Sequence, residues 1–94
     1  MPDGDHLFAL GRLLGTPGAL SAFARTGENP ITYVLRHWRL DPGVLSAEDQ
    51  QANHRAVEHG GRILSAYLLR DGTRIWIITE ADRSTTTVLL PDEY

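Results

Sequence analysis

Two runs of apolar residues in the first half of the chain are spaced like one face of an α-helix. They are Ala19, Leu20, Phe23 and Ala24, and then Ile31, Val34, Leu35 and Trp38. Each run follows a side chain that can accept a hydrogen bond from a free helix amide and then a proline, at Thr16-Pro17 and at Asn29-Pro30. The pattern predicts two short amphipathic helices, the first of which ends at Gly27.

A third helix is predicted over residues 47–59. Residues 46–49 resemble a capping box, with Asp49 in place of the more usual Glu or Gln, and Gly60-Gly61 would end the helix. This segment has little beyond Ala52, Ala56 and Val57 to bury. We therefore expect the third helix to lie on the surface.

After residue 61 the apolar residues alternate as they do in β-strands. Residues 62–70 and 73–80 form two such runs around Asp71-Gly72, a strong hairpin signal, and a third run at residues 85–90 stops at Pro91. Residues 10–15 are predicted as a further strand. The expected fold class is α+β, with an N-terminal strand and a C-terminal three-stranded meander in one four-stranded antiparallel sheet, three short helices, and the order β-α-α-α-β-β-β.

The predicted turn fixes which residues of the hairpin face each other. A two-residue turn places Leu68 opposite Ile75, Ala66 opposite Ile77 and Tyr67 opposite Trp76. One face would then form the core under the helices, and it comprises Leu64, Ala66, Leu68, Ile75, Ile77, Val88 and Leu90. The other face would carry Ile63, Tyr67, Leu69, Trp76, Ile78 and Leu89, with Ser65, Arg74, Glu80, Thr85 and Thr87 around them.

The second of these faces is more apolar than a solvated sheet face should be. The N-terminal segment or a helix could cover it, or the Tyr67 and Trp76 pair could simply stiffen the hairpin. If the face is open, its aromatic pair would form the centre of an interface with a protein partner or with a second copy in a homodimer. The expected interface residues are Tyr67, Trp76, Leu69, Ile78, Leu89 and Arg74.

A polar cluster is expected in the loop between the second and third meander strands. It comprises Glu80, Asp82, Arg83 and Ser84. If folding brings His37 to this loop, the groups could serve a small enzyme or toxin-like nuclease. The more common structural interpretation is that Asp82 and Ser84 cap the turn and that Arg83 pairs with a carboxylate.

Length and composition limit the class of protein. Ninety-four residues make one domain over residues 1–94, and the polar residues 1–6 are expected to be disordered. The chain has no cysteine, which excludes disulfides and thiolate sites and favours the cytoplasm. No apolar stretch approaches the roughly 20 residues that a membrane span needs, so no membrane association is expected.

Charge and histidine spacing argue against two further kinds of site. The net charge is −3, all nine basic residues are arginines, and acidic residues separate Arg36 and Arg39 from Arg62, Arg70 and Arg74. A nucleic-acid partner is therefore not expected unless folding brings residues 62, 70 and 74 onto one surface. No pair of the four histidines has the i, i+4 spacing of a helical metal site. We expect neither a metal nor a cofactor.

Several stretches of the chain together resemble a known group of proteins. They are TPGAL at residues 16–20, GRILSAY at 61–67, IWIITEADRS at 75–84 and LLP at 89–91, with Asp49 and Asn53. In these stretches the chain resembles small uncharacterised bacterial proteins of plasmid and mobile-element type, sometimes labelled plasmid-related or as a restriction-enzyme subunit. The resemblance implies a bacterial origin and a regulatory or defence-related accessory role, and it assigns no catalytic residue.

Overall fold

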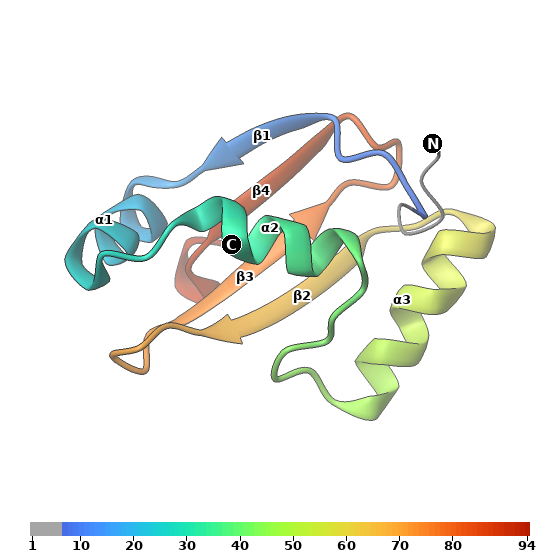
Figure 1. Ribbon diagram of the computed structural model, residues 1–94. Helices are drawn as coiled ribbons and strands as arrows, with labels where there is room; N and C mark the ends of the chain where they lie inside the picture. Colours follow the sequence, from blue (N-terminus) through green and yellow to red (C-terminus); the bar gives the residue numbers. More distant parts are fainter. Residues whose placement is uncertain (1–6) are drawn as a thin grey trace.

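The three helices and the four strands of one sheet occur along the chain in the predicted order (Figure 1). The computed structural model describes residues 7–94, so the expected disorder of residues 1–6 lies outside the described residues. The elements are β1 (Arg12–Gly15), α1 (Pro17–Thr26), α2 (Pro30–Trp38), α3 (Ala47–His59), β2 (Ile63–Leu68), β3 (Arg74–Thr79), β4 (Thr85–Leu89) and the short 3-10 helix η1 (Pro91–Glu93). Of the helices in the described part, none has the length and apolar character that crossing a membrane requires.

The helices begin where their capping residues predict. The Thr16 hydroxyl accepts from the backbone N–H of Ala19 at 3.2 Å, and the Ser46 side chain accepts from that of Asp49 at 3.1 Å. The Asn29 side chain caps α2 in the same way. Gly27 adopts the left-handed backbone conformation that ends α1, with φ of 74°.

The sheet is mixed, which corrects the all-antiparallel prediction. The strand order is β1-β4-β3-β2, and β1 pairs with β4 in parallel, with Arg12 opposite Thr85 and Gly15 opposite Val88. Apolar alternation identifies a strand but carries no information about its direction. The direction of β1 follows from the long helical crossover that returns the chain to the far edge of the sheet.

The hairpin has a three-residue loop, so the predicted register is wrong by one residue. Leu68 lies opposite Arg74, and the N–H of Leu69 donates to the carbonyl of Thr73 at 2.9 Å. The N–H of Gly72 donates to the carbonyl of Leu69 at 2.9 Å, and Gly72 itself is left-handed, with φ of 86°. This is a type I turn followed by a left-handed residue, the usual three-residue hairpin loop.

The shift moves every side chain of β2 to the opposite face of the sheet. Tyr67 now pairs with Ile75, and Trp76 pairs with Ala66 rather than with Tyr67. We call the two sides of the sheet the first face and the second face. The first face carries Ile63, Ser65, Tyr67, Ile75, Ile77, Thr79, Thr86 and Val88. The second face carries Leu64, Ala66, Leu68, Arg74, Trp76, Ile78, Thr87 and Leu89. Leu64, Ala66 and Leu68 therefore do not lie on the face under α2 as predicted, although Ala66 is buried. The pairing of Ile77 with Val88 is confirmed.

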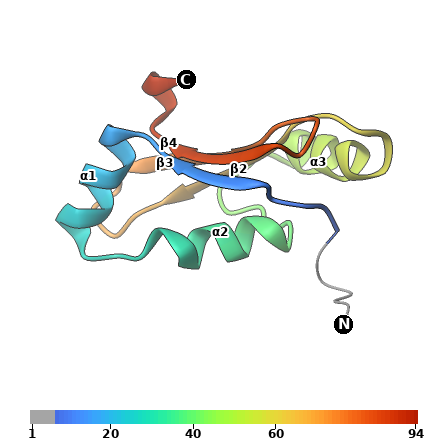
Figure 2. The same cartoon turned by 90° about the horizontal axis from the view of Figure 1, so that it is seen from above.

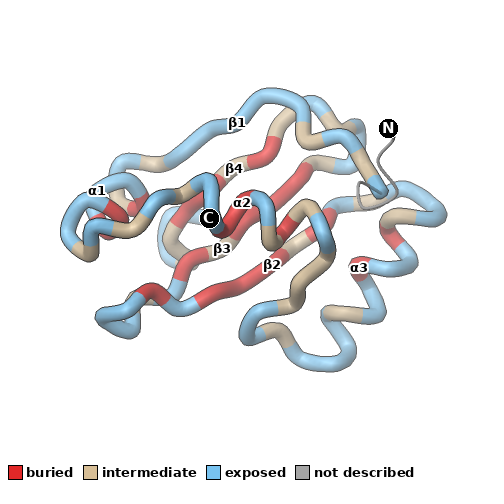
Figure 3. The backbone as a smooth tube through the Cα atoms, viewed as in Figure 1, coloured by how far each residue is buried: buried red, intermediate tan, exposed pale blue. Residues whose placement is uncertain are grey.

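The two faces are covered to different extents. Helix α2 lies over the first face and α1 packs at one end of it, whereas the C-terminal segment lies on the other side of the sheet and α3 lies beside β2 (Figure 2). Buried positions concentrate along β2, β3 and β4 and on the inner sides of the helices (Figure 3). Residues Ala19, Ala22, Phe23, Tyr33, Val34, Tyr67, Leu69, Ile75, Ile77 and Val88 form the main core.

The left-handed residue of the hairpin loop gives a first prediction. Gly72→Ala should lower the free energy of unfolding by about 1 kcal/mol, because an L-residue is strained at positive φ. Space is not the cause, since an added Cβ at Gly72 has no neighbour within 4 Å. Gly72→Asn should cost less, because asparagine tolerates the left-handed region. Urea unfolding of the three proteins tests this, and an Ala variant as stable as wild type would contradict it.

Candidate functional site

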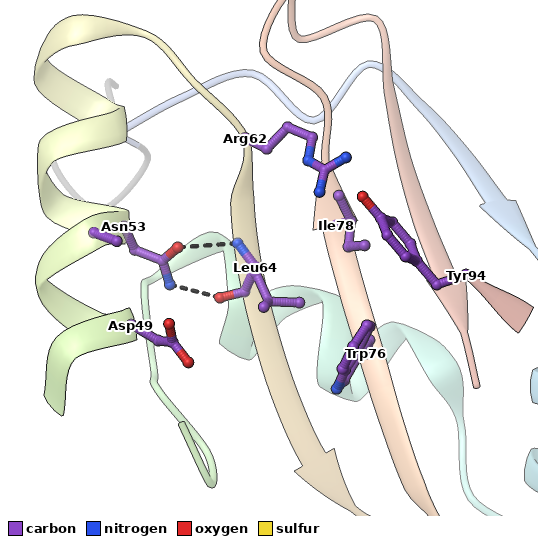
Figure 4. A pocket seen from close by; sticks show the side chains of 8 residues that line it. Asp49, Asn53, Arg62, Leu64, Trp76, Ile78 and Tyr94 are labelled. Carbon is purple, nitrogen blue, oxygen red and sulfur yellow. Dashed lines mark hydrogen bonds between the residues drawn. The ribbon is translucent and has the colours of Figure 1, made fainter. Parts of the chain in front are cut away.

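A cavity of about 320 Å³ lies between α3, the second face of the sheet and the C-terminal residue (Figure 4). It is lined by Asp49, Ala52, Asn53, Arg62, Leu64, Trp76, Ile78 and Tyr94. Its floor is apolar and comes from neighbouring strands, with Leu64 on β2 and with Trp76 and Ile78 on β3. The polar groups stand at its sides.

The side chain of Asn53 links helix α3 to β2. The amide nitrogen of Asn53 donates to the carbonyl of Leu64 at 2.6 Å, and the N–H of Leu64 donates to the amide oxygen of Asn53 at 3.0 Å. These backbone groups of Leu64 point away from β3, so Asn53 satisfies an edge that would otherwise be unpaired. Asp49 precedes Asn53 by four residues, on the same side of the helix, and its carboxylate faces the cavity (Figure 4).

Tyr94 forms the side of the cavity opposite α3 and packs on Trp76 of the floor. The rings of Trp76 and Tyr94 meet edge to face, with centroids 5.9 Å apart and planes at 67°. The guanidinium carbon of Arg62 lies 5.1 Å from the centre of the Tyr94 ring. Trp76 is half-buried and Tyr94 is 64% exposed. The site therefore offers an accessible aromatic surface with a cation on one side and a carboxylate on the other.

Glu93 fixes the position of Tyr94. One carboxylate oxygen accepts from the N–H of Gly18 at 2.9 Å, and the other accepts from the N–H of Leu90 at 2.9 Å and from the Thr16 hydroxyl. The hydrogen bond from Thr16 is the main cause that lowers the pKa of Glu93. A carboxylate at the N-terminus of α1 is also favoured by the helix dipole. The C-terminal segment is thus tied to α1, and Tyr94 is held over Trp76.

The structure separates the predicted interface residues. Trp76 and Ile78 line the cavity, and Leu89 and the exposed Arg74 share the second face with them. Tyr67 and Leu69 are buried in the core with exposed fractions of 1% and 3%. The expected pairing of Tyr67 with Trp76 is therefore wrong, because the three-residue loop turns Tyr67 toward the helices.

Tyr67 has a structural role in the core. Its hydroxyl donates to the carbonyl of Asp41 at 2.8 Å, and the guanidinium of Arg36 lies 4.5 Å from its ring centre. Burial raises the pKa of Tyr67 to about 12. These contacts fasten the segment after α2 to the sheet.

His37 points into the core and belongs to a buried chain of hydrogen bonds. Its Nδ1 lies 2.7 Å from the Ser65 hydroxyl, and its Nε2 lies 2.8 Å from the Thr79 hydroxyl. Thr79 in turn lies 2.7 Å from Thr86, which donates to the carbonyl of Leu10 at 2.7 Å.

The carbonyl of Leu10, at the end of this series of hydrogen bonds, determines which group is the donor in each of them. A carbonyl can only accept, so the single proton of Thr86 goes to Leu10 and Thr79 must donate to Thr86. Thr79 then accepts from Nε2, which fixes His37 as the Nε2–H tautomer with Nδ1 accepting from Ser65. Desolvation by burial lowers the pKa of His37 to about 4, so the ring is neutral at pH 7. With no exposed surface and both nitrogens bonded, His37 cannot reach a substrate.

The polar loop also has structural partners. The Arg83 guanidinium donates to the carbonyls of Ala56 at 3.0 Å and Gly61 at 2.6 Å, and so satisfies the C-terminal end of α3. Asp82 accepts from the backbone N–H of Ser84 at 2.9 Å, as the capping interpretation expects. Arg83 pairs with carbonyls rather than with a carboxylate. Glu80, Asp82, Arg83, Ser84 and His37 thus form no common open site.

Within residues 7–94 no three side chains of His, Cys, Asp or Glu are grouped so that they could hold a metal ion. Comparison of the chain with protein-family models, with curated proteins and with solved structures finds no match. The geometry of the cavity is therefore the basis for assigning a function.

Sequence reasoning missed most of the cavity wall. The i, i+4 spacing of Asp49 and Asn53 is visible in the sequence and marks one side of α3. Tyr94 is an aromatic residue beside the acidic Glu93 at the end of the chain, but nothing in the sequence indicates that Glu93 folds back onto Thr16. Arg62 was expected only at the start of a strand and as one of three arginines that a nucleic-acid surface would need, and nothing in the sequence placed it beside Tyr94.

The buried histidine gives a second prediction. In the unfolded chain His37 binds a proton below its usual pKa of 6.5, whereas in the folded protein it binds one only near pH 4. The free energy of unfolding should therefore fall as the pH is lowered from 6.5 to 4, by about 1.4 kcal/mol per pH unit and about 3 kcal/mol in total.

Urea unfolding between pH 7 and pH 5 isolates this effect, because acids whose pKa is lowered by folding lose their contribution mainly below their unfolded values of 3.8 to 4.5. His37→Gln keeps a hydrogen-bonding side chain and should flatten the profile in this range. Equal slopes in the two proteins would contradict the assignment.

Proposed function

We propose that the chain is a non-enzymatic interaction module that binds a protein partner through the cavity on its second face. The observation that carries the proposal is the accessible edge-to-face pair that Trp76, on the apolar floor, forms with Tyr94 at its side. Aromatic anchors set in a hollow with polar groups at its rim are typical centres of protein interfaces. The proposal keeps Trp76 and Ile78, which line the cavity, from the expected interface. It omits the buried Tyr67, Leu69 and Leu89 and also Arg74, which lies outside the lining.

The cavity is large enough to take one large side chain of a protein partner. Its 320 Å³ stands at the low end of the range of about 300–1,000 Å³ that small-molecule and cofactor sites occupy. An aromatic or aliphatic side chain would contact Leu64, Trp76 and Ile78 at the floor. Its burial would supply most of the binding free energy through the hydrophobic effect.

The charges at the rim would orient the partner. Asp49 stands on the α3 side and Arg62 stands beside Tyr94. A partner segment with a basic residue on one side of its apolar anchor and an acidic residue on the other would match both groups. Such rim charges add specificity and association rate more than affinity.

The competing enzyme interpretation has weaker support. A nuclease would need an accessible general base, and the neutral, enclosed ring of His37 does not provide one. A regulatory or defence-related accessory in a bacterial mobile element remains the prediction that the resemblance implies, and a binding module is consistent with such a role.

The cavity gives a third prediction, tested with a displayed library of random peptides selected on the immobilised protein. Selected peptides should share a large apolar residue flanked by charges. Ala52→Arg places a long side chain from an exposed position of α3 into the cavity, so it should weaken binding of these peptides about 30-fold or more, the size of a hot-spot loss. Tyr94→Ala removes the aromatic wall and should also weaken binding.

Gln51→Arg is the matched control, because it adds the same side chain at the neighbouring exposed position, outside the cavity lining. It should leave peptide affinity unchanged. A library that yields no binder, or binders whose affinity is the same for wild type and Ala52→Arg, would overturn the proposed function.

A further inference from the structure

The two edge strands of the sheet differ in whether their outward backbone groups have hydrogen-bond partners. At β2, Asn53 bonds both backbone groups of Leu64, and the carbonyl of Ala66 accepts from the N–H of Val44 at 2.8 Å. At the other edge, β1 has β4 on one side and no described strand on the other. In Figure 1, β1 forms the upper border of the sheet with no helix across it. An uncovered edge strand is a template for pairing with another strand.

The pairing with β4 shows which groups of β1 are open. The N–H of Arg12 donates to the carbonyl of Ser84 at 2.9 Å, and that of Thr16 donates to the carbonyl of Val88 at 3.0 Å. In a parallel pair alternate residues bond the neighbour, so Arg12, Leu14 and Thr16 face β4. The N–H and C=O groups of Leu13 and Gly15 therefore point outward.

Apolar side chains surround this open edge. Leu13 and Leu14 are 48% and 41% exposed, and nearby Leu20 and Ile31 are 50% and 46% exposed. Leu13 and Leu14 also line a shallow apolar groove of about 160 Å³ with Gly15, Leu20, Pro30, Ile31, Val34 and Val88. Large aliphatic side chains this exposed at an unpaired edge mark an interaction surface.

We propose that β1 pairs with β1 of a second copy of this chain, antiparallel about a two-fold axis, to join two sheets into one. With Leu14 opposite Leu14 on the axis, Leu13 of each copy lies opposite Gly15 of the other. The outward N–H and C=O groups of these residues then all find partners across the interface. Gly15 adds no side chain there, so Leu13 can pack against Leu20 of the second copy, which covers Gly15.

The same register is complementary in charge. It places Arg12 opposite Thr16 of the second copy, whose hydroxyl donates to Glu93. Arg12 is exposed and forms no ion pair within residues 7–94, so its guanidinium can approach that carboxylate. A two-fold axis perpendicular to the sheet also leaves both Trp76 cavities on one side, so the dimer would offer a partner two equivalent sites.

Solution mass tests the pairing. Light scattering of the wild-type chain should give twice its 10.4 kDa, and Leu14→Arg, which sets two cations against each other on the axis, should halve the mass while the circular dichroism spectrum stays unchanged. Leu68→Arg is the control, because Leu68 is also an exposed strand leucine, at 47%, but lies on β2. A monomeric wild type, or a Leu14→Arg variant that remains dimeric, would overturn the proposal.

A single introduced cysteine tests the register, since the chain has no cysteine of its own. Residues directly opposite in a non-hydrogen-bonded pair have Cβ atoms about 4.5–5.5 Å apart, close enough for a disulfide after a small adjustment. Leu14→Cys should therefore form a covalent dimer on mild oxidation, and Leu68→Cys should remain a monomer on denaturing gels. Equal cross-linking of the two variants would contradict the two-fold pairing at Leu14.

Discussion

The left-handed backbone of Gly72 sets the register of the β2–β3 hairpin, and the division of the molecule into a core and a binding face depends on that register. A loop one residue shorter would exchange the two faces of β2. With the three-residue loop, Tyr67 joins the core with Ile75 and Ile77, and Leu64 and Ala66 lie beside Trp76 on the second face. The floor of the cavity is therefore a consequence of the turn geometry.

A buried series of hydrogen bonds holds helix α2 against the first face of the sheet. His37 links α2 to β2 and β3 through Ser65 and Thr79, and Thr86 extends the series to the segment before β1. Buried polar groups are costly unless every one is bonded, and among the described residues no buried side-chain nitrogen or oxygen lacks a partner. Helix α2 is thereby held against the first face, and the second face contacts α3, Tyr94 and solvent.

Local signals in the sequence predicted the helices well, because a cap is decided by a few neighbouring residues. Thr16, Asn29 and Ser46 each bond the helix amides that their positions indicate, and α3 has the predicted bounds. The existence of four strands was also predicted. All of these depend on short-range spacing or on apolar periodicity.

The predictions that failed concern features that depend on contacts between distant parts of the chain. Asp71-Gly72 is compatible with a two-residue and a three-residue loop. The loop formed is accompanied by contacts with α1, where Arg25 lies 3.3 Å from Asp71, and with the segment after α1, where Glu28 accepts from the N–H of Arg70 at 3.0 Å. The parallel direction of β1 and the return of Glu93 to Thr16 are likewise set by tertiary packing. The cavity was therefore predictable only in Trp76 and Ile78 and in the shared helix side of Asp49 and Asn53.

Backbone proton distances in solution test the register most directly. Non-hydrogen-bonded antiparallel pairs bring their Cα atoms to about 4.5 Å, which gives strong nuclear Overhauser effects between Hα protons. The account predicts such effects between Ala66 and Trp76 and between Leu64 and Ile78 in the isotope-labelled protein. A strong effect between Tyr67 and Trp76 instead would place Tyr67 beside Trp76 and contradict the division into core and binding face.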